Sequence, residues 1–250
     1  MNLKIPTMLV SALTVLAFSS NGGAGGAGTV TGRALDTKGK PIGNAKIWVK
    51  PVVTTGLYST RTDENGRYEA SGLPPVGYRV MGWFEKEYNG QRYCLRLGHP
   101  NVTDYNPLNP AKGVTRDLLW RTSGRIEDVE LYSDSGYFGG SISVMSENYI
   151  PARNTTLEFT LTPTGKLIDG SSGKTLVRQP NSEGYILDVP VGVYKASATI
   201  FENGIKKSVR LGSTTNHLGS NTTLEFPGAK QSCVGTSASG VERAYLYWGT

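Results

Sequence analysis

Short runs of β-branched and aromatic residues, each closed by a turn signal, recur along most of the chain and limit what it can fold into. Residues 62–80, TDENGRYEASGLPPVGYRV, read as strand, turn, strand, turn and strand with almost no residue to spare. Beyond the N-terminus, apolar residues never keep the 3.6-residue spacing of a helix. Gly and Pro supply 45 of the 250 residues, about 18% where an average chain has about 12%. These patterns predict an all-β chain without long helices.

The first 20 residues differ from the rest in composition. Lys4 precedes an apolar-biased run from Ile5 to Phe18, and small residues follow it. The run is short for a membrane span, which needs about 20 residues, and glycine-rich chain follows it in place of a basic stop signal. We therefore predict a signal peptide over residues 1–20, a Gly-rich linker over residues 21–28, and a secreted or cell-surface protein that has no transmembrane segment after signal removal.

Charge and cysteine content agree with export. The formal net charge is +6, and the Lys and Arg residues are scattered along the chain instead of forming blocks. A mildly basic exported surface is the favoured interpretation, and we expect no specific nucleic-acid binding. Attraction to acidic polysaccharide, anionic lipid or nucleic acid is the sharper alternative. The two cysteines can form one bridge in an oxidising compartment.

Part of the strand-and-turn pattern returns about 114 residues later. Residues 89–98, NGQRYCLRLG, match residues 203–212, NGIKKSVRLG, at five of ten positions without a gap. Upstream, a Gly-Tyr element and a Pro-Val-Gly element leading to Tyr78 return in the same order and lead to Tyr194. Three matches in one order indicate an internal repeat.

Domain boundaries follow from this repetition. We predict two related β-sandwiches over residues 29–121 and 122–228. The apolar runs Val114–Trp120 and Thr222–Phe226 are the expected closing strands of the two copies. Residues 229–250 are then a C-terminal tail with a final strand.

The first domain resembles a known family, the carboxypeptidase regulatory-like domain. The resemblance implies a prealbumin-like (transthyretin-like) antiparallel β-sandwich, so the predicted fold class is all-β with two tandem sandwiches of this kind, the second inferred through the repeat. Similar domains are mostly accessory modules of peptidases, surface proteins or carbohydrate-active systems, which implies binding or structural support. The residues that carry the resemblance are Val30 to Arg33, Asp36 to Ile42, Ala45, Thr62 to Tyr68 and Leu73 to Tyr78.

No residue pattern indicates catalysis, a metal or a cofactor. His99 and His217 are the only histidines, and neither has His, Cys or clustered carboxylates at ligand spacing, so both are expected in surface loops. Glu127 and Asp128 could serve a glycosidase, but they lie in a charged, linker-like stretch where solvated positions are expected. We predict that the protein is not an enzyme and needs no cofactor.

One catalytic branch of the resembling fold remains as a less favoured alternative. Its hydroxyisourate hydrolases end in Tyr-Arg-Gly-Ser, whereas this chain ends in Tyr247-Trp248-Gly249-Thr250. Trp248 replaces the arginine, and no histidine precedes it in a suitable setting. A hydrolase of this branch is therefore not expected.

Apolar and polar residues alternate along residues 91–97, and this alternation predicts the direction in which Cys94 points. Tyr93, Leu95 and Leu97 alternate with polar residues, and Cys94 falls on the polar side. An outward-facing Cys94 would be available to bond Cys233 in the tail, and closing so long a loop is stabilising. Intermolecular pairing and two free thiols are the alternatives.

Two functions outside catalysis follow. The first is a binding or structural module, with polysaccharide or cell-wall glycan as the first ligand class, through side chains expected to be exposed: Trp83, Tyr88, Arg92 and Arg96. The second is a self-assembling surface or filament subunit. Its aromatic final strand, Val241 to Trp248, must be covered by something, either by its own sandwich or by strand addition to a neighbouring molecule.

Overall fold

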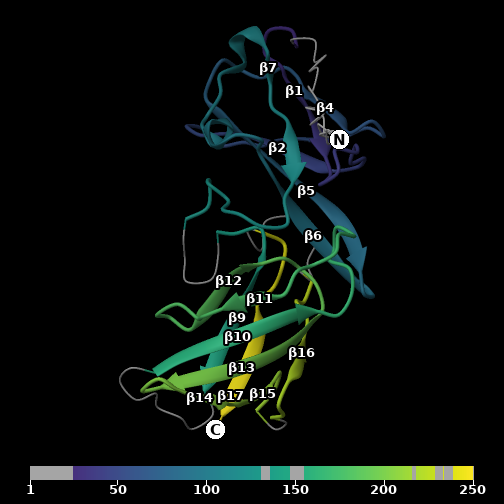
Figure 1. Ribbon diagram of the computed structural model, residues 1–250. Helices are drawn as coiled ribbons and strands as arrows, with labels where there is room; N and C mark the ends of the chain where they lie inside the picture. Colours follow the sequence, from purple (N-terminus) through teal and green to yellow (C-terminus); the bar gives the residue numbers. More distant parts are fainter. Residues whose placement is uncertain are drawn as a thin grey trace, which may run out of the picture.

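Two β-sandwiches joined in series make up the computed structural model (Figure 1). The prediction of an all-β chain with two such sandwiches is confirmed. In the described part of the chain the helical segments are two short 3-10 turns, η1 (Val102–Tyr105) and η2 (Pro110–Lys112), and no helix is long and apolar enough to cross a membrane. The structure describes residues 25–130, 136–146, 155–215, 218–228, 233 and 239–249.

Several predictions concern residues outside these ranges. The predicted signal peptide over residues 1–20 and His217 both lie there, as does most of the predicted Gly-rich linker. Export through an N-terminal signal therefore stays a prediction.

The first sandwich is one continuous sheet folded into two layers. Its strand order is β3-β2-β5-β6-β8-β1-β4, with β7 beside β1. β6 pairs with β5 along most of its length and then with β8 at Leu97 and Gly98, so it passes from one layer into the other. The strands are β1 (Val30–Leu35), β2 (Lys46–Pro51), β3 (Tyr58–Arg61), β4 (Arg67–Ala70), β5 (Tyr78–Tyr88), β6 (Gln91–Gly98), β7 (Val114–Thr115) and β8 (Leu118–Trp120).

The second sandwich has two sheets, β11-β10-β13-β14 and β12-β9-β17-β15, with β16 beside β13. Only Val209 separates β14 from β15, so this pair crosses between the layers as β6 does. The order β11-β10-β13-β14/β15-β17-β9-β12 therefore matches the first sandwich strand for strand. The strands are β9 (Gly140–Ser146), β10 (Thr155–Pro163), β11 (Leu176–Arg178), β12 (Tyr185–Val189), β13 (Tyr194–Glu202), β14 (Ile205–Ser208), β15 (Arg210–Gly212), β16 (Thr222–Leu224) and β17 (Ala244–Gly249).

Strand registers align the two sandwiches residue by residue. Tyr78 pairs with Pro51 in the first sandwich, and Tyr194 pairs with Pro163 in the second. At the crossing strand, Leu97 pairs with Trp120, and Leu211 pairs with Trp248. The buried cores of both sandwiches are thus built from the same positions, and Trp248 is the counterpart of Trp120.

This alignment corrects the predicted closing strand of the second sandwich. β17 lies inside its sheet, parallel to β9 and antiparallel to β15, and Ala244, Leu246 and Trp248 are buried. β16, predicted to close the sandwich, instead pairs with the start of β13. The sequence misled because β8 follows β6 closely in the first sandwich, whereas β16 and a long connection come before β17 in the second and separate it from the repeat.

The repeated turns form where their residues predict. Asn89-Gly90 and Asn203-Gly204 each carry two positive φ angles, 48° and 69° in the first and 51° and 80° in the second. Two-residue hairpins need this geometry, which Asn and Gly tolerate. The Asn89-Gly90 turn closes the β5–β6 hairpin at the lower end of the first sandwich, where the hairpin reaches the second (Figure 1).

Candidate functional site

The junction between the sandwiches gathers most of the polar side chains that the sequence singled out. The tip of the β5–β6 hairpin touches the second sandwich through hydrogen bonds. Tyr88 Oη donates to the carbonyl of Lys166 at 2.7 Å, and Tyr93 Oη donates to the carbonyl of Phe226 at 2.6 Å. Burial raises the pKa of the Tyr93 hydroxyl to about 12, so this donor keeps its proton at any physiological pH.

A stretch of the second sandwich runs along the outer edge of β6. We call it the strap and define it as the described residues 226–228, 233 and 239–241 between β16 and β17. The backbone N–H of Arg96 donates to the carbonyl of Ser239 at 3.1 Å. Gly240 has a φ of 83° and lies so close to the Cys94 carbonyl that a Cβ would overlap it. The strap therefore needs glycine where it meets the strand edge.

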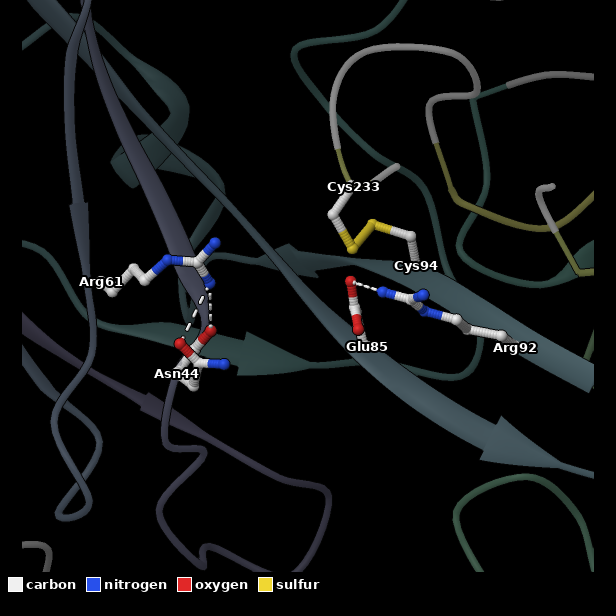
Figure 2. The surroundings of a disulfide bond; sticks show 6 residues. All are labelled: Asn44, Arg61, Glu85, Arg92, Cys94 and Cys233. Carbon is white, nitrogen blue, oxygen red and sulfur yellow. Dashed lines mark hydrogen bonds and ion pairs between the residues drawn. A yellow bond between two sulfur atoms is a disulfide. The ribbon is translucent and has the colours of Figure 1, made fainter. Parts of the chain in front are cut away.

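A disulfide joins the strap to β6. Cys94 and Cys233 are bonded, with their Cα atoms 5.1 Å apart (Figure 2). Beside it, the carboxylate of Glu85 on β5 pairs with the guanidinium of Arg92. The predicted pairing is thus present in the structure. Cys94 lies outside the hydrophobic core to which Tyr93, Leu95 and Leu97 belong, and it is buried because the strap covers that side of β6.

An ion pair is buried in the same junction. Arg96 Nη2 lies 2.7 Å from Asp128 Oδ2, and the two side chains are only 5% and 7% exposed. The Arg96 guanidinium also lies over the Trp83 ring, 4.8 Å from its centroid, in cation–π contact. Asp128 belongs to the segment linking the sandwiches. Because its carboxylate is buried against Arg96, the expectation that it is solvated is wrong.

The four residues predicted to bind a ligand do lie on one hairpin, but they do not form one exposed surface. Trp83 and Arg96 are cross-strand neighbours and both are buried. Tyr88 is half-buried with its hydroxyl engaged, whereas Arg92 is exposed. The premise that Trp83 and Arg96 face solvent is wrong, since alternation along a strand cannot show that another segment covers its polar face.

His99 is also buried, against the expectation of a surface loop. Its Nε2 lies 3.0 Å from the Val80 carbonyl, and its ring meets that of Tyr105 edge-on at 4.6 Å. Burial lowers the pKa of His99 despite hydrogen bonds to backbone carbonyls that raise it. The neutral ring donates a hydrogen bond to the Val80 carbonyl and packs against Tyr105 of η1. His99 therefore has a structural role.

A polar cavity of about 280 Å³ opens beside the buried ion pair. Its walls come from β5, from η1 and from the segment between the sandwiches, so no sequence motif could reveal it. It combines a phenol ring with charges of both signs, which suits a ligand rich in hydroxyl or amine groups. In the described ranges, no group of three or more His, Cys, Asp or Glu residues could hold a metal. The lining residues are Arg79, Val102, Thr103, Tyr105, Asn106, Glu127 and Asp128.

Comparison with known families gives one match. Residues 29–86 match the carboxypeptidase regulatory-like domain, which confirms the resemblance for this segment. The matched range covers β1 to β4 and most of β5. A comparison with curated proteins finds no match.

Similar solved structures are distant. The Bacillus anthracis TIE protein is 13% identical with a TM-score of 0.32, and the alignment covers 89% of this chain and 34% of that one. A streptococcal ancillary pilin is 10% identical with a TM-score of 0.28, covering 88% and 61%. A mutant of the shaft pilin spaA from Lactobacillus rhamnosus GG is 10% identical with a TM-score of 0.22, covering 89% and 97%. The chain thus spans less than two thirds of the first two, and such low scores carry no functional argument.

Proposed function

We propose that this chain is an exported, non-catalytic structural module in which two tandem copies of one sandwich are locked end to end as a rigid unit. The junction carries this proposal, because the disulfide and the strap fix the second sandwich to β6, and the buried ion pair fixes the linking segment to the same strand. The apolar start of the chain and the disulfide support an oxidising, extracytoplasmic location.

Rigidity is a measurable consequence of this proposal. We expect small-angle X-ray scattering of the exported chain to fit a single arrangement of the two sandwiches. The matched comparison is the Cys94→Ser/Cys233→Ser variant, in which the same sandwiches should sample a broader range of arrangements. Scattering from the unaltered chain that requires a broad ensemble would refute the rigid unit.

Glycan binding is a second candidate, and the polar cavity favours it. Its volume of about 280 Å³ has room for one sugar ring, and Arg79, Asn106 and Glu127 offer the donors and acceptors that hydroxyls need. We expect binding on an array of polysaccharides and cell-wall glycans to weaken on Arg79→Ala or Asn106→Ala. Arg33→Ala, an exposed position on β1, serves as control, and an array without signal removes this candidate.

A further inference from the structure

The internal junction brings together two kinds of surface. One is the hairpin tip between β5 and β6, where Tyr88 donates to the Lys166 carbonyl. The other is the loop over residues 164–175, between β10 and β11, which contains Lys166 and Gly170. Gly170 lies near Lys38 of the first sandwich, since a Cβ on it would stand 3.7 Å from Lys38 Nζ. A hairpin end of one sandwich thus meets a loop end of the next.

Each of these two surfaces has an equivalent in the other sandwich, at an end of the molecule that faces away from the junction. Tyr88 pairs with Gln91 around the first hairpin turn, and Glu202 pairs with Ile205 around the equivalent turn. This second hairpin tip, between β13 and β14, lies at the far end of the second sandwich (Figure 1). Likewise, the loop over residues 52–57 follows β2 as residues 164–175 follow β10. Because Pro51 pairs with Tyr78 at the start of β5, this loop lies at the end of the first sandwich opposite the β5–β6 hairpin.

Exposed apolar side chains lie at both outer ends, three of them grouped in the residue 52–57 loop and one at the tip of the β13–β14 hairpin. Seven large hydrophobic side chains are exposed in the described part of the chain, and four of them are at the two counterpart surfaces. Single exposed hydrophobic residues are ordinary, but grouped ones mark contact sites. These four are Val52 (43% exposed), Val53 (73%), Leu57 (47%) and Ile205 (61%).

From this placement we propose that copies of the chain associate end to end, with the β13–β14 hairpin of one copy against the residue 52–57 loop of the next. The inference rests on the rigid unit proposed above, whose internal junction it repeats between molecules. Because the two contacting surfaces differ, the contact is heterologous, and its repetition builds an open filament wherever the rotation between copies does not close a ring. It uses no free C-terminal strand, since β17 is already paired on both sides.

The contact between copies must be weaker than the internal junction. Ser208 stands where the first hairpin has Cys94, and Lys207 stands where it has Tyr93, as the registers around Ile205 and Gln91 show. Lys207 forms an ion pair with Glu202 at 2.9 Å. The second hairpin therefore offers neither the disulfide nor the tyrosine hydrogen bond, and association should be reversible and dependent on protein concentration.

Cysteine cross-linking between singly substituted proteins tests this contact. Full-length chains carrying Val53→Cys and Ile205→Cys are mixed under mild oxidation, and mass spectrometry verifies that the Cys94–Cys233 bond stays intact. We expect the mixed dimer to form several-fold faster than in a mixture of Val53→Cys with Val177→Cys, whose position on β11 is 51% exposed. The double variant Val53→Cys/Ile205→Cys should give a ladder of oligomers.

Equal cross-linking in the two mixtures would overturn the end-to-end contact. Sedimentation velocity of the unaltered chain adds an independent measurement, with larger species expected at higher concentration and suppressed by Ile205→Lys. A monomer at all concentrations that still scatters as a rigid unit would sink this inference alone, and the proposed structural function would stand.

Discussion

At the scale of single residues, the junction depends on charges removed from water. Arg96 is held by Asp128 and by the face of Trp83, and all three side chains are buried. A buried ion pair gives little net stability compared with apolar residues, but losing one partner strands the other charge. The pair therefore specifies how the linking segment docks more than how tightly the core holds.

Asp128→Ala should destabilise the protein by roughly 3–5 kcal/mol, because it leaves the Arg96 guanidinium buried and unpaired. Urea denaturation with the disulfide intact measures this change. The control is Glu127→Ala, whose ion pair with Arg125 is one-third exposed and should contribute less than about 1 kcal/mol. Equal effects of the two substitutions would contradict a special role for Asp128.

His99 predicts a pH dependence of stability. Burial lowers its pKa below the ordinary 6.5, so below that pH the unfolded chain binds a proton that the folded chain resists. The free energy of unfolding should therefore fall as pH drops through 6.5 toward the lower folded pKa. His99→Gln should flatten this part of the profile, and an NMR titration that places the folded pKa above 6.5 would contradict the assignment.

At the scale of elements, the strap explains why β6 differs from its counterpart β14. β6 is buried from Tyr93 onward, whereas all four residues of β14 are exposed. The same strand position is thus covered in one sandwich and open in the other. The difference comes from the long β16–β17 connection, which only the second sandwich has.

The disulfide tests the strap directly. Cys94→Ser/Cys233→Ser should destabilise the protein by about 4–5 kcal/mol in the chain-entropy model, since the bond links residues 139 apart. Serine suits the strand, as Ser208 occupies the equivalent position of β14. Guanidinium denaturation of the oxidised protein and the variant measures the difference, and matching midpoints would show that the strap holds without its bond.

Local sequence signals predicted the strands and turns better than they predicted which side chains other segments bury. Asn89-Gly90 and Asn203-Gly204 encode their turns locally, so the hairpins and the two-sandwich architecture could be predicted. The burial of Arg96 could not, because the Asp128 carboxylate that pairs with its guanidinium lies 32 residues away in the segment linking the sandwiches. The cavity was missed for the same reason, since its walls come from three separate parts of the chain.

At the scale of the whole molecule, the two sandwiches form one body. Buried residues of both sandwiches belong to one hydrophobic cluster, and the disulfide between the strap and β6 joins the sandwiches covalently. Such coupling holds the two sandwiches in one arrangement. It also sets the outer ends in fixed directions, which end-to-end association requires.

Differential scanning calorimetry of the chain with its disulfide intact tests this claim most directly. If the sandwiches are locked together, both unfold in one cooperative transition whose calorimetric and van't Hoff enthalpies agree for the full chain. Two resolved transitions, or a van't Hoff enthalpy near half the calorimetric value, would show that each sandwich unfolds alone and would contradict the locked unit.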